Sequence, residues 1–309
     1  MPRYFRKLAT LLKGETTYGV DSAPIAANAL LMTNVSIEPF QGEEEARELY
    51  LPWLGHQGVL LVGNFAKVSG SIELAGSGAA GDAPAFGPAL RACGLAEVIS
   101  AGVKVDYLPV SSGYESASIY WNMDGVNHIL LGARGNVQLA TYTPKRIPRL
   151  QFEFWGLMGA IADVALPEVD HAGFQDPLPV SKDNSPVFSI HGTPCVAESF
   201  AFNLGNQVEP RLLIGRDTME IVNRSATGTA VVEAVSVASK NWIGISKSHA
   251  KGAIAVQHGT VAGNICEISA PAVQIGRPTV GQTQGITNNS LPLMFTPDEG
   301  DDELTLTFR

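Results

Sequence analysis

Alternation of polar and apolar residues is the sequence feature that most restricts how this chain can fold. In residues 67–74, Val68, Ile72 and Leu74 share one face, and the opposite face carries Lys67, Ser69, Ser71 and Glu73. A period of two is typical of a strand with one buried and one polar face. Residues 151–155 and 304–309 alternate in the same way. With many Gly, Pro and β-branched residues, the pattern predicts an all-β fold with minor α-helix.

Turn residues and apolar runs predict further elements. Asn122–Gly125 is expected to form the turn of a hairpin. Val231–Ala238 is apolar on both faces, which is typical of a central strand. Helical patterns are scarce, and we expect helices only at Glu43–Tyr50 and at Pro84–Ala92, the second ending at Gly94.

A segment without periodicity divides the chain into parts of similar size. Residues 166–186 concentrate proline with Asp, Gly and Ser, a composition typical of a linker. The sequence therefore predicts an N-terminal arm at 1–30, a first domain at 31–165, a linker at 166–186 and a second domain at 187–309.

The two parts also share short motifs in the same order. Asn34–Pro39 resembles Asn206–Pro210, and Val137–Thr143 resembles Val273–Thr279. In both parts a terminal apolar strand follows the second motif. Repeated motifs in one order indicate a duplicated β domain.

The charge balance excludes a protein that grips nucleic acid. The chain has 30 Asp and Glu against 21 Lys and Arg, a formal charge of −9, whereas such proteins carry a basic surface. An acidic surface past which DNA slides remains compatible with this charge. The first thirteen residues contain no acid and hold Arg3, Arg6, Lys7 and Lys13. This basic start is either a clamp onto another molecule or a mobile, solvated terminus.

No motif predicts catalysis, a metal or a cofactor. Gly76–Gly81 matches the dinucleotide-binding pattern, but the strand before it alternates and no βαβαβ series surrounds it, so we expect a flexible loop. The histidines are scattered, and the three cysteines are far apart. The acidic runs Glu43–Glu45 and Asp301–Glu303 are expected to be solvated.

The chain also lacks an apolar run of membrane-spanning length and a start of the signal-peptide type. We therefore expect synthesis in a cytoplasm and no membrane partner. The remaining features are a duplicated β fold, a basic start, a glycine-rich loop and an acidic body, which together indicate a structural protein that assembles.

Several loose motifs, spread over most of the chain, resemble the major tail tube protein of long-tailed bacteriophages. They are Lys13–Gly19, Asn28–Asn34, Gly76–Gly81 with Leu90–Gly94, Asp124–Gly125 with His128, Gly132–Gly135, and the ending from Gly263–Asn264 through Pro271–Ile275 to the last strand. The resemblance implies tandem β-sandwich or barrel domains, each with a short flanking helix. It also implies a non-enzymatic subunit, made in the host bacterial cytoplasm, whose stacked rings in the virion tail conduct DNA at ejection.

A chain with two tube domains implies a ring of three chains with pseudo-sixfold symmetry, in place of six single-domain subunits. If the second half is only a surface decoration, the ring returns to six chains. Further partners implied by the resemblance are the tape-measure, tail terminator and baseplate proteins, with DNA only transiently in the lumen.

The resemblance also assigns residues as hypotheses. The lumen-lining candidates are Lys67, Ser69, Ser71, Glu73 and Glu233; the alternatives are an ordinary outer surface and, for Glu233, a buried ion pair. The candidates for contacts between rings are Arg3, Arg6, Lys7, Lys13, Glu43, Glu44, Glu45, Gly76, Gly78 and Gly81, with the acidic triplet receiving the basic start.

Other functions stay open from the sequence. One is an inner tube or another tail component of a contractile phage. Another is a cytoplasmic β-sandwich enzyme with an unrecognised site, which turnover or tight ligand binding by a monomer would favour. A surface adhesin is the third, although the tryptophans do not cluster as a carbohydrate-binding module would require.

Overall fold

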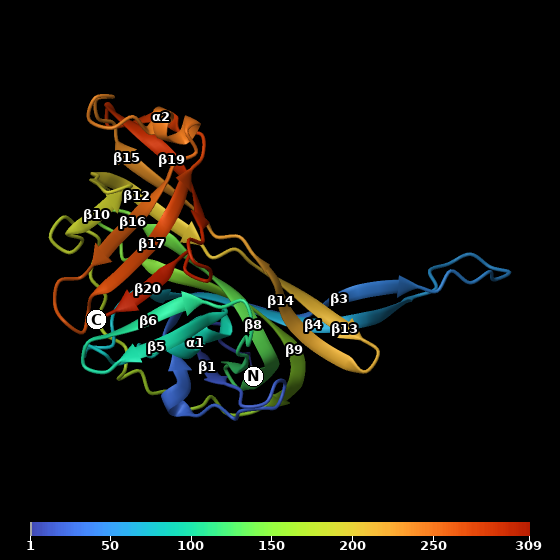
Figure 1. Ribbon diagram of the computed structural model, residues 1–309. Coiled ribbons are helices and arrows are strands. Elements are labelled where there is room, and N and C mark those ends of the chain that lie inside the picture. The colour runs from blue at the N-terminus through green and yellow to red at the C-terminus, as the bar shows by residue number, and fades with distance from the viewer. Residues whose placement is uncertain (1) are drawn as a thin grey trace.

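The computed structural model describes residues 2–309, which fold mostly as β-strands (Figure 1). The first half contains β1 (Leu8–Gly14), β2 (Ala29–Leu30), β3 (Met32–Ala46), β4 (Val59–Glu73), β5 (Leu95–Ser100), β6 (Lys104–Pro109), β7 (Ala117–Met123), β8 (Val126–Tyr142) and β9 (Arg149–Asp163). The second half contains β10 (Val187–Ile190), β11 (Thr193–Pro194), β12 (Ala197–Asn203), β13 (Asn206–Leu213), β14 (Arg216–Arg224), β15 (Thr227–Glu233), β16 (Lys251–His258), β17 (Cys266–Ile275), β18 (Thr279–Thr283), β19 (Ile286–Thr296) and β20 (Thr305–Phe308).

Helix is a minor component of residues 2–309. It comprises α1 (Gly87–Ala92), α2 (Trp242–Lys247) and the 3-10 turn η1 (Ala26–Asn28). The expected all-β fold with minor helix is thereby confirmed. Within the described residues, no helix combines the length and the apolar character needed to cross a membrane.

The strands of the two halves pair in the same antiparallel order. In the first half the order is β3-β4-β9-β8-β7-β1-β2. In the second half it is β12-β15-β19-β17-β16-β10-β11. The short helices also occupy matching places, since α1 lies in the chain between β4 and β7 and α2 between β15 and β16.

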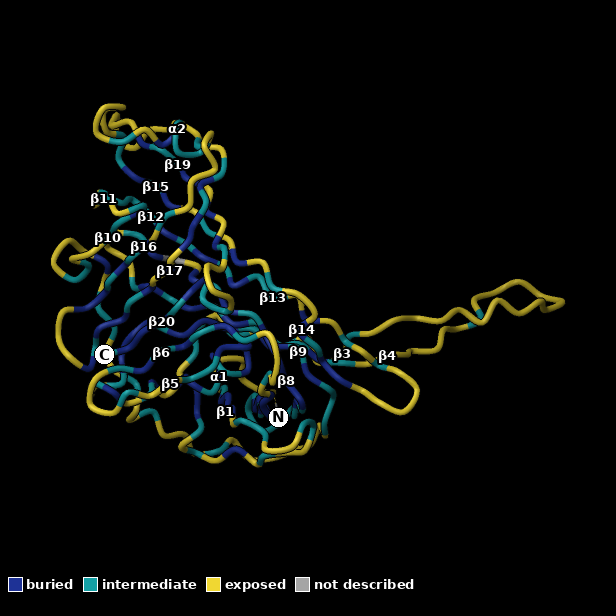
Figure 2. The backbone as a smooth tube through the Cα atoms, viewed as in Figure 1, coloured by how far each residue is buried: buried dark blue, intermediate teal, exposed yellow. Residues whose placement is uncertain are grey.

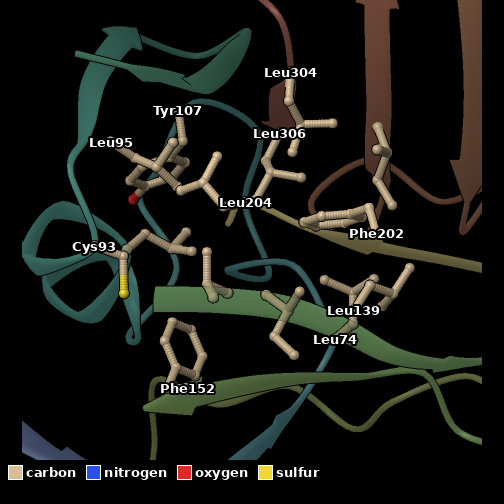
Figure 3. Packing of buried hydrophobic residues seen from close by; sticks show 14 of the residues in the cluster. Leu74, Cys93, Leu95, Tyr107, Leu139, Phe152, Phe202, Leu204, Leu304 and Leu306 are labelled. Atoms are coloured by element: carbon tan, nitrogen blue, oxygen red, sulfur yellow. The ribbon is translucent and has the colours of Figure 1, made fainter. Parts of the chain in front are cut away.

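Backbone pairing joins the halves into one continuous sheet. β12 adds to the C-terminal part of β8, with Phe202 opposite Leu139, and β20 pairs with β6, with Leu306 opposite Tyr107. Figure 3 shows side chains of both halves in one hydrophobic core, including Leu139 of β8 beside Phe202 of β12. The halves therefore share a core as well as a sheet.

Two hairpins leave this body on the same side (Figure 1). We define the arm as residues 38–64 of β3, β4 and the loop between them; it extends far from the body and is largely exposed along its length (Figure 2). The β13–β14 hairpin instead lies against the first half, where Val208, Met219 and Ile221 pack on Trp155 and neighbouring side chains.

The helix expected at Glu43–Tyr50 is wrong. Residues up to Ala46 continue β3, where Glu43–Glu45 pair with the apolar segment Leu60–Val62. Glutamate favours a helix locally, but pairing with a β-prone partner strand outweighs that preference.

The second expected helix and the expected turn are confirmed, whereas the expected central strand is confirmed only in part. α1 begins at Gly87, later than expected, and has Pro88 in its first turn, while Gly94 follows it with a φ of +75°. The strand predicted at Val231–Ala238 is wrong beyond Glu233: β15 (Thr227–Glu233) does lie centrally, between β12 and β19, but residues 234–238 form no strand and Val235 and Val237 are exposed. The predicted turn at Asn122–Gly125 joins β7 and β8.

The core at the junction of the halves makes a stability prediction. Phe202 is 2% exposed, so we expect Phe202→Ala to lower the free energy of unfolding by about 3–5 kcal/mol, through lost burial and the cavity left behind. Chemical denaturation followed by tryptophan fluorescence measures this change. The control is Ile214→Ala at the fully exposed tip of the β13–β14 hairpin, for which we expect a change below about 0.5 kcal/mol. Equal effects of the two variants would contradict a shared core.

Candidate assembly and lumen surfaces

A row of uncharged polar residues crosses the sheet from one half to the other. Strand register places the row in line, each residue opposite the next: Ser71 (β4), Gln151 (β9), Gln138 (β8), Asn203 (β12) and Thr227 (β15). Residues opposite one another in an antiparallel sheet share a face, and this face is turned away from the core residues Phe152, Leu139 and Phe202. We call these residues the polar row.

Hydrogen bonds between amides fix part of this face. Gln138 Nε2 donates to Gln151 Oε1 at 2.9 Å. Asn136 Nδ2 donates to Asn203 Oδ1 at 2.8 Å across the junction of the halves. The surface around Gln138, Asn203 and Thr227 is a shallow, open hollow. The polar face is therefore continuous and concave where the halves meet.

The lumen candidates of β4 lie on this face, as the alternation predicts. Two of them are engaged: Glu73 pairs with Arg149 at 3.0 Å, and the Lys67 ammonium lies 5.3 Å from the centre of the Trp155 ring. Glu233 is half-buried at the end of β15, and its carboxylate enters no ion pair with any described residue.

Sequence reasoning did not identify the rest of the polar row. The missed residues are Gln138, Gln151, Asn203 and Thr227. Alternation within each strand is readable from the sequence, but the register that aligns these residues arises from pairing between distant strands. Only the face of a single strand was therefore predictable.

Strand edges are the second candidate surface. Along one edge of β8, the N-terminal part pairs with β7 and the C-terminal part with β12. In the second half, β17 and β18 together take the place of β8. β16 pairs along one edge of β17 as far as Gln274, and β19 pairs with the opposite edge of β17 and β18. Beyond Gln274, residues 275–283 pair with no described strand on the edge that continues from β16.

β3 has the complementary unpaired edge. β12 lies between β15 and β8, whereas β3, in the matching place of the first half, pairs with β4 alone among the described strands. One copy of the chain thus carries an unpaired edge of each kind. Exposed edges of this sort readily accept another strand.

Specific side-chain contacts hold the β13–β14 hairpin on the first half, and we call this contact surface its seat. The buried Arg134 of β8 donates to the Met219 carbonyl at 2.8 Å and to Glu220 at 2.5 Å. Its guanidinium lies 4.9 Å from the centre of the Tyr18 ring, and the Tyr18 hydroxyl accepts a 2.6 Å hydrogen bond from the Met219 backbone. Burial raises the pKa of the Tyr18 phenol, which keeps it neutral beside the cation. Arg134 thus holds the hairpin in place.

Only the first residues of the basic start lie outside the sheet. Residues 8–14 form β1 within the sheet, and Lys13 is an exposed side chain of that strand. Arg3 and Arg6 are exposed, and Lys7 lies 3.7 Å from Asp124. Within the N-terminal arm predicted at residues 1–30, residues 2–7 precede the first strand, and Met1 lies outside the described residues.

The glycine-rich loop contacts the second half of its own chain. The Gly76 amide donates to the Asn264 side chain at 2.8 Å, and the Gly78 amide donates to the Gly263 carbonyl at 2.8 Å. A Cβ on Gly76 would come within 2.1 Å of the Gly263 carbonyl, so only glycine fits there. Gly81 is buried and has a φ of +82°, while Gly78 is exposed. Of the three glycines, Gly78 is the one left accessible to another molecule.

The acidic triplet Glu43–Glu45 is exposed on the arm, well away from the N-terminal segment (Figure 1). Contact between these two groups therefore requires two chains. Among residues 2–309, no group of three or more His, Cys, Asp and Glu side chains is arranged to hold a metal ion.

Comparison with known proteins identifies a family. The family model for phage tail tube proteins matches residues 7–308, nearly the whole chain. No curated protein matches the chain significantly.

The hairpin seat makes a prediction about local stability. Arg134→Ala removes the hydrogen bonds to the Met219 carbonyl and to Glu220, which keeps Arg216. We therefore expect the free energy of unfolding to fall by about 1–3 kcal/mol and amide hydrogen exchange to become faster over residues 206–224. Arg216→Ala is the control, because Arg216 also contacts Glu220 but its side chain is 69% exposed; we expect less than about 1 kcal/mol there. Unchanged exchange in Arg134→Ala would show that the hairpin is held by other contacts.

Proposed function

The chain belongs to the phage tail tube protein family, and from this premise we propose that it is the repeating tube subunit of a long, non-contractile phage tail. Members of this family are structural proteins of the virion tail that self-assemble into a tube. In this proposal, closed rings of the subunit stack axially, and the genome passes through their lumen at ejection.

Ring closure follows from the strand pairing of the two halves. The same strand order in both halves supports two tandem tube domains, and the β8–β12 pairing supplies the joint between them within one chain. The unpaired edge of β3 and the unpaired edge of residues 275–283 would make the same joint between chains. Such a contact is heterologous, so each copy gives one edge and accepts one, and a closed ring leaves neither exposed.

Three chains then give a ring of six tube domains, in which joints within chains alternate with joints between chains. This arrangement agrees with the pseudo-sixfold ring expected for a duplicated tube domain. The single observation that carries it is the β8–β12 joint flanked by unpaired edges of matching type.

The polar row is our candidate for the lumen wall. Ser71 is buried, and the amide and hydroxyl side chains of the other four residues offer DNA neither cations to bind nor a strong field to oppose entry. Lys67, Glu73 and Glu233 flank the row, and the Glu73–Arg149 pair offsets its own charge. We propose a weakly adhesive, polar bore, less acidic than the net charge of the chain suggests.

Axial contacts would involve the exposed N-terminal segment and Gly78. Arg3, Arg6 and Lys7 would meet acidic side chains of the adjacent ring. The ends of the tube would meet the terminator and baseplate proteins, and the tape-measure protein would occupy the lumen before DNA. An inner tube under a contractile sheath is the alternative within the same family.

Negative-stain electron microscopy of the purified protein, at several concentrations, tests the proposed function. We expect hollow rings or tubes, and rotational averaging should give six similar densities built from three chains. Native mass spectrometry of the rings counts the chains independently. A monomer at every concentration, together with turnover or tight binding of a small molecule, would contradict a tube subunit.

Reversing charge at Arg6 and Lys7 tests the axial contact. We expect Arg6→Glu with Lys7→Glu to leave rings intact but to stop their stacking, because a basic segment can no longer meet an acidic neighbour. Tube length in micrographs measures this effect. Lys145→Glu with Lys182→Glu is the control of equal charge change at exposed positions. Tubes of normal length in the first variant would remove this contact from the proposal.

A further inference from the structure

β3 carries carboxylates that form no ion pair within residues 2–309. Glu38, Glu43, Glu44 and Glu45 are exposed, β3 contains no Lys or Arg, and none of the four enters an ion pair within residues 2–309. Across the arm, Glu43–Glu45 face only the apolar segment Leu60–Val62 in register. We call these four residues the acidic edge. Lys67 lies opposite Glu38 in the strand register, and the exposed Arg47 follows the strand, but neither forms an ion pair with these carboxylates. Glu43–Glu45 therefore remain free to pair with cations of another molecule.

A matching group of cations lies in the second half. Lys247 at the end of α2, Lys251 at the start of β16 and Arg277 just after β17 are exposed and enter no ion pair among the described residues. We call them the basic cluster.

The backbone holds the basic cluster together. Lys251 pairs in register with Gln274, three residues before Arg277. Next to Lys247, the Ser246 hydroxyl donates to the carbonyl of Gly276, the residue before Arg277. The three cations therefore surround the start of the unpaired edge 275–283.

The intrachain joint indicates how two copies bring these groups together. β12 pairs with β8 as far as Gln138, and the chain then continues as β13 across the first half, where Asn206 donates to the Gly135 carbonyl at 3.0 Å. β3 holds the place of β12 in the strand order, and it runs on into the arm without a break. If β3 paired with residues 275–283 of another copy as β12 pairs with β8, the chain would run on past Gln274 and Lys251 of that copy, as β13 runs on past Gly135. The acidic edge would then lie beside Lys251.

We infer that the acidic edge of one copy docks on the basic cluster of the next copy in the ring. This inference rests on the proposed function and names the charged contact that selects the partner edge. The partner is a second copy of this chain. Opposite charges on two self-complementary edges direct the correct pairing and disfavour acidic edge against acidic edge.

The apolar side of the arm supports the same occupant. A two-stranded ribbon alone in water is marginally stable, yet Leu60 and Leu61 of the arm are about half exposed. Near the unpaired edge of the second half, Val280 and Ile286 are exposed as well. Docking between copies would cover both apolar groups, as the seat at Arg134 covers the β13–β14 hairpin.

Two charge-reversal variants and their combination test the inference. The acidic-edge variant is Glu38→Lys, Glu43→Lys and Glu45→Lys, and the cluster variant is Lys247→Glu, Lys251→Glu and Arg277→Glu. We expect each alone to raise the protein concentration needed for rings by roughly tenfold or more, because like charges then face each other. Carrying all six changes on one chain should restore ring formation, since complementarity returns.

A control with the same charge change sits in the linker. Glu168→Lys, Asp176→Lys and Asp183→Lys alter exposed acids there and should leave ring formation unchanged. Circular dichroism of each variant verifies folding, and native mass spectrometry measures the fraction of chains assembled into rings. Normal rings in both single-surface variants would overturn the inference while leaving the tube function intact. Absence of rings in the unmodified protein and in every variant would instead contradict the proposed function itself.

Disulfide trapping provides a second measurement that does not depend on charge. In a Cys195→Ser background, we expect Glu38→Cys combined with Arg277→Cys, or with Lys251→Cys, to form oxidised dimers and trimers and nothing larger within isolated rings. Glu168→Cys in place of the Glu38 change is the control. If rings form from both double-cysteine variants but no chains in them are crosslinked after oxidation, the inference is also overturned.

Discussion

Backbone hydrogen bonding along strand edges is the constraint on which the rest of this structure depends. A sheet that ends in water leaves a row of N–H and C=O groups ready to pair with any strand. This chain satisfies one such row internally, where β12 adds to β8 beside Gln138 and Leu139. In the proposed ring, a second copy would supply the same pairing at β3 and at residues 275–283. Assembly would then extend the pairing that already holds the two halves together.

The two hairpins differ in whether the chain itself covers them: the β13–β14 hairpin packs on the first half, and the arm is exposed. β13–β14 rests on a buried cation, an aromatic ring and an apolar cluster of the first half. The arm has no comparable seat among residues 2–309, and Figure 2 shows that its residues are exposed along most of its length. Natural monomers seldom expose such a ribbon. The difference between the hairpins follows from position: the first half lies beside one of them, and only another chain can lie beside the other.

Local pattern predicted the strands well and their partners poorly. Alternation at residues 67–74 identified the polar face of β4, and turn residues located the β7–β8 hairpin. At Glu43–Glu45 local preference for helix was misleading, because the segment Leu60–Val62 pairs with it. The polar row needed the register of Gln138, Gln151 and Asn203, which depends on contacts between distant residues. The family resemblance supplied the tube, but the edges that would close a ring became visible only from strand pairing.

Charge is sorted by location in this molecule, and the sorting has a reason if rings stack as proposed. Every side chain of the polar row would be repeated around each ring and again in each ring along the tube, so a single cation there would become a long cationic track that retains DNA. A single anion would become an equally long barrier. The amides and hydroxyls of the row avoid both outcomes, and of the charges that flank the row, Lys67 lies over Trp155 and Glu73 pairs with Arg149. The exposed charges of the acidic edge and the basic cluster lie at strand edges instead, where repetition around a ring pairs each charge with its opposite.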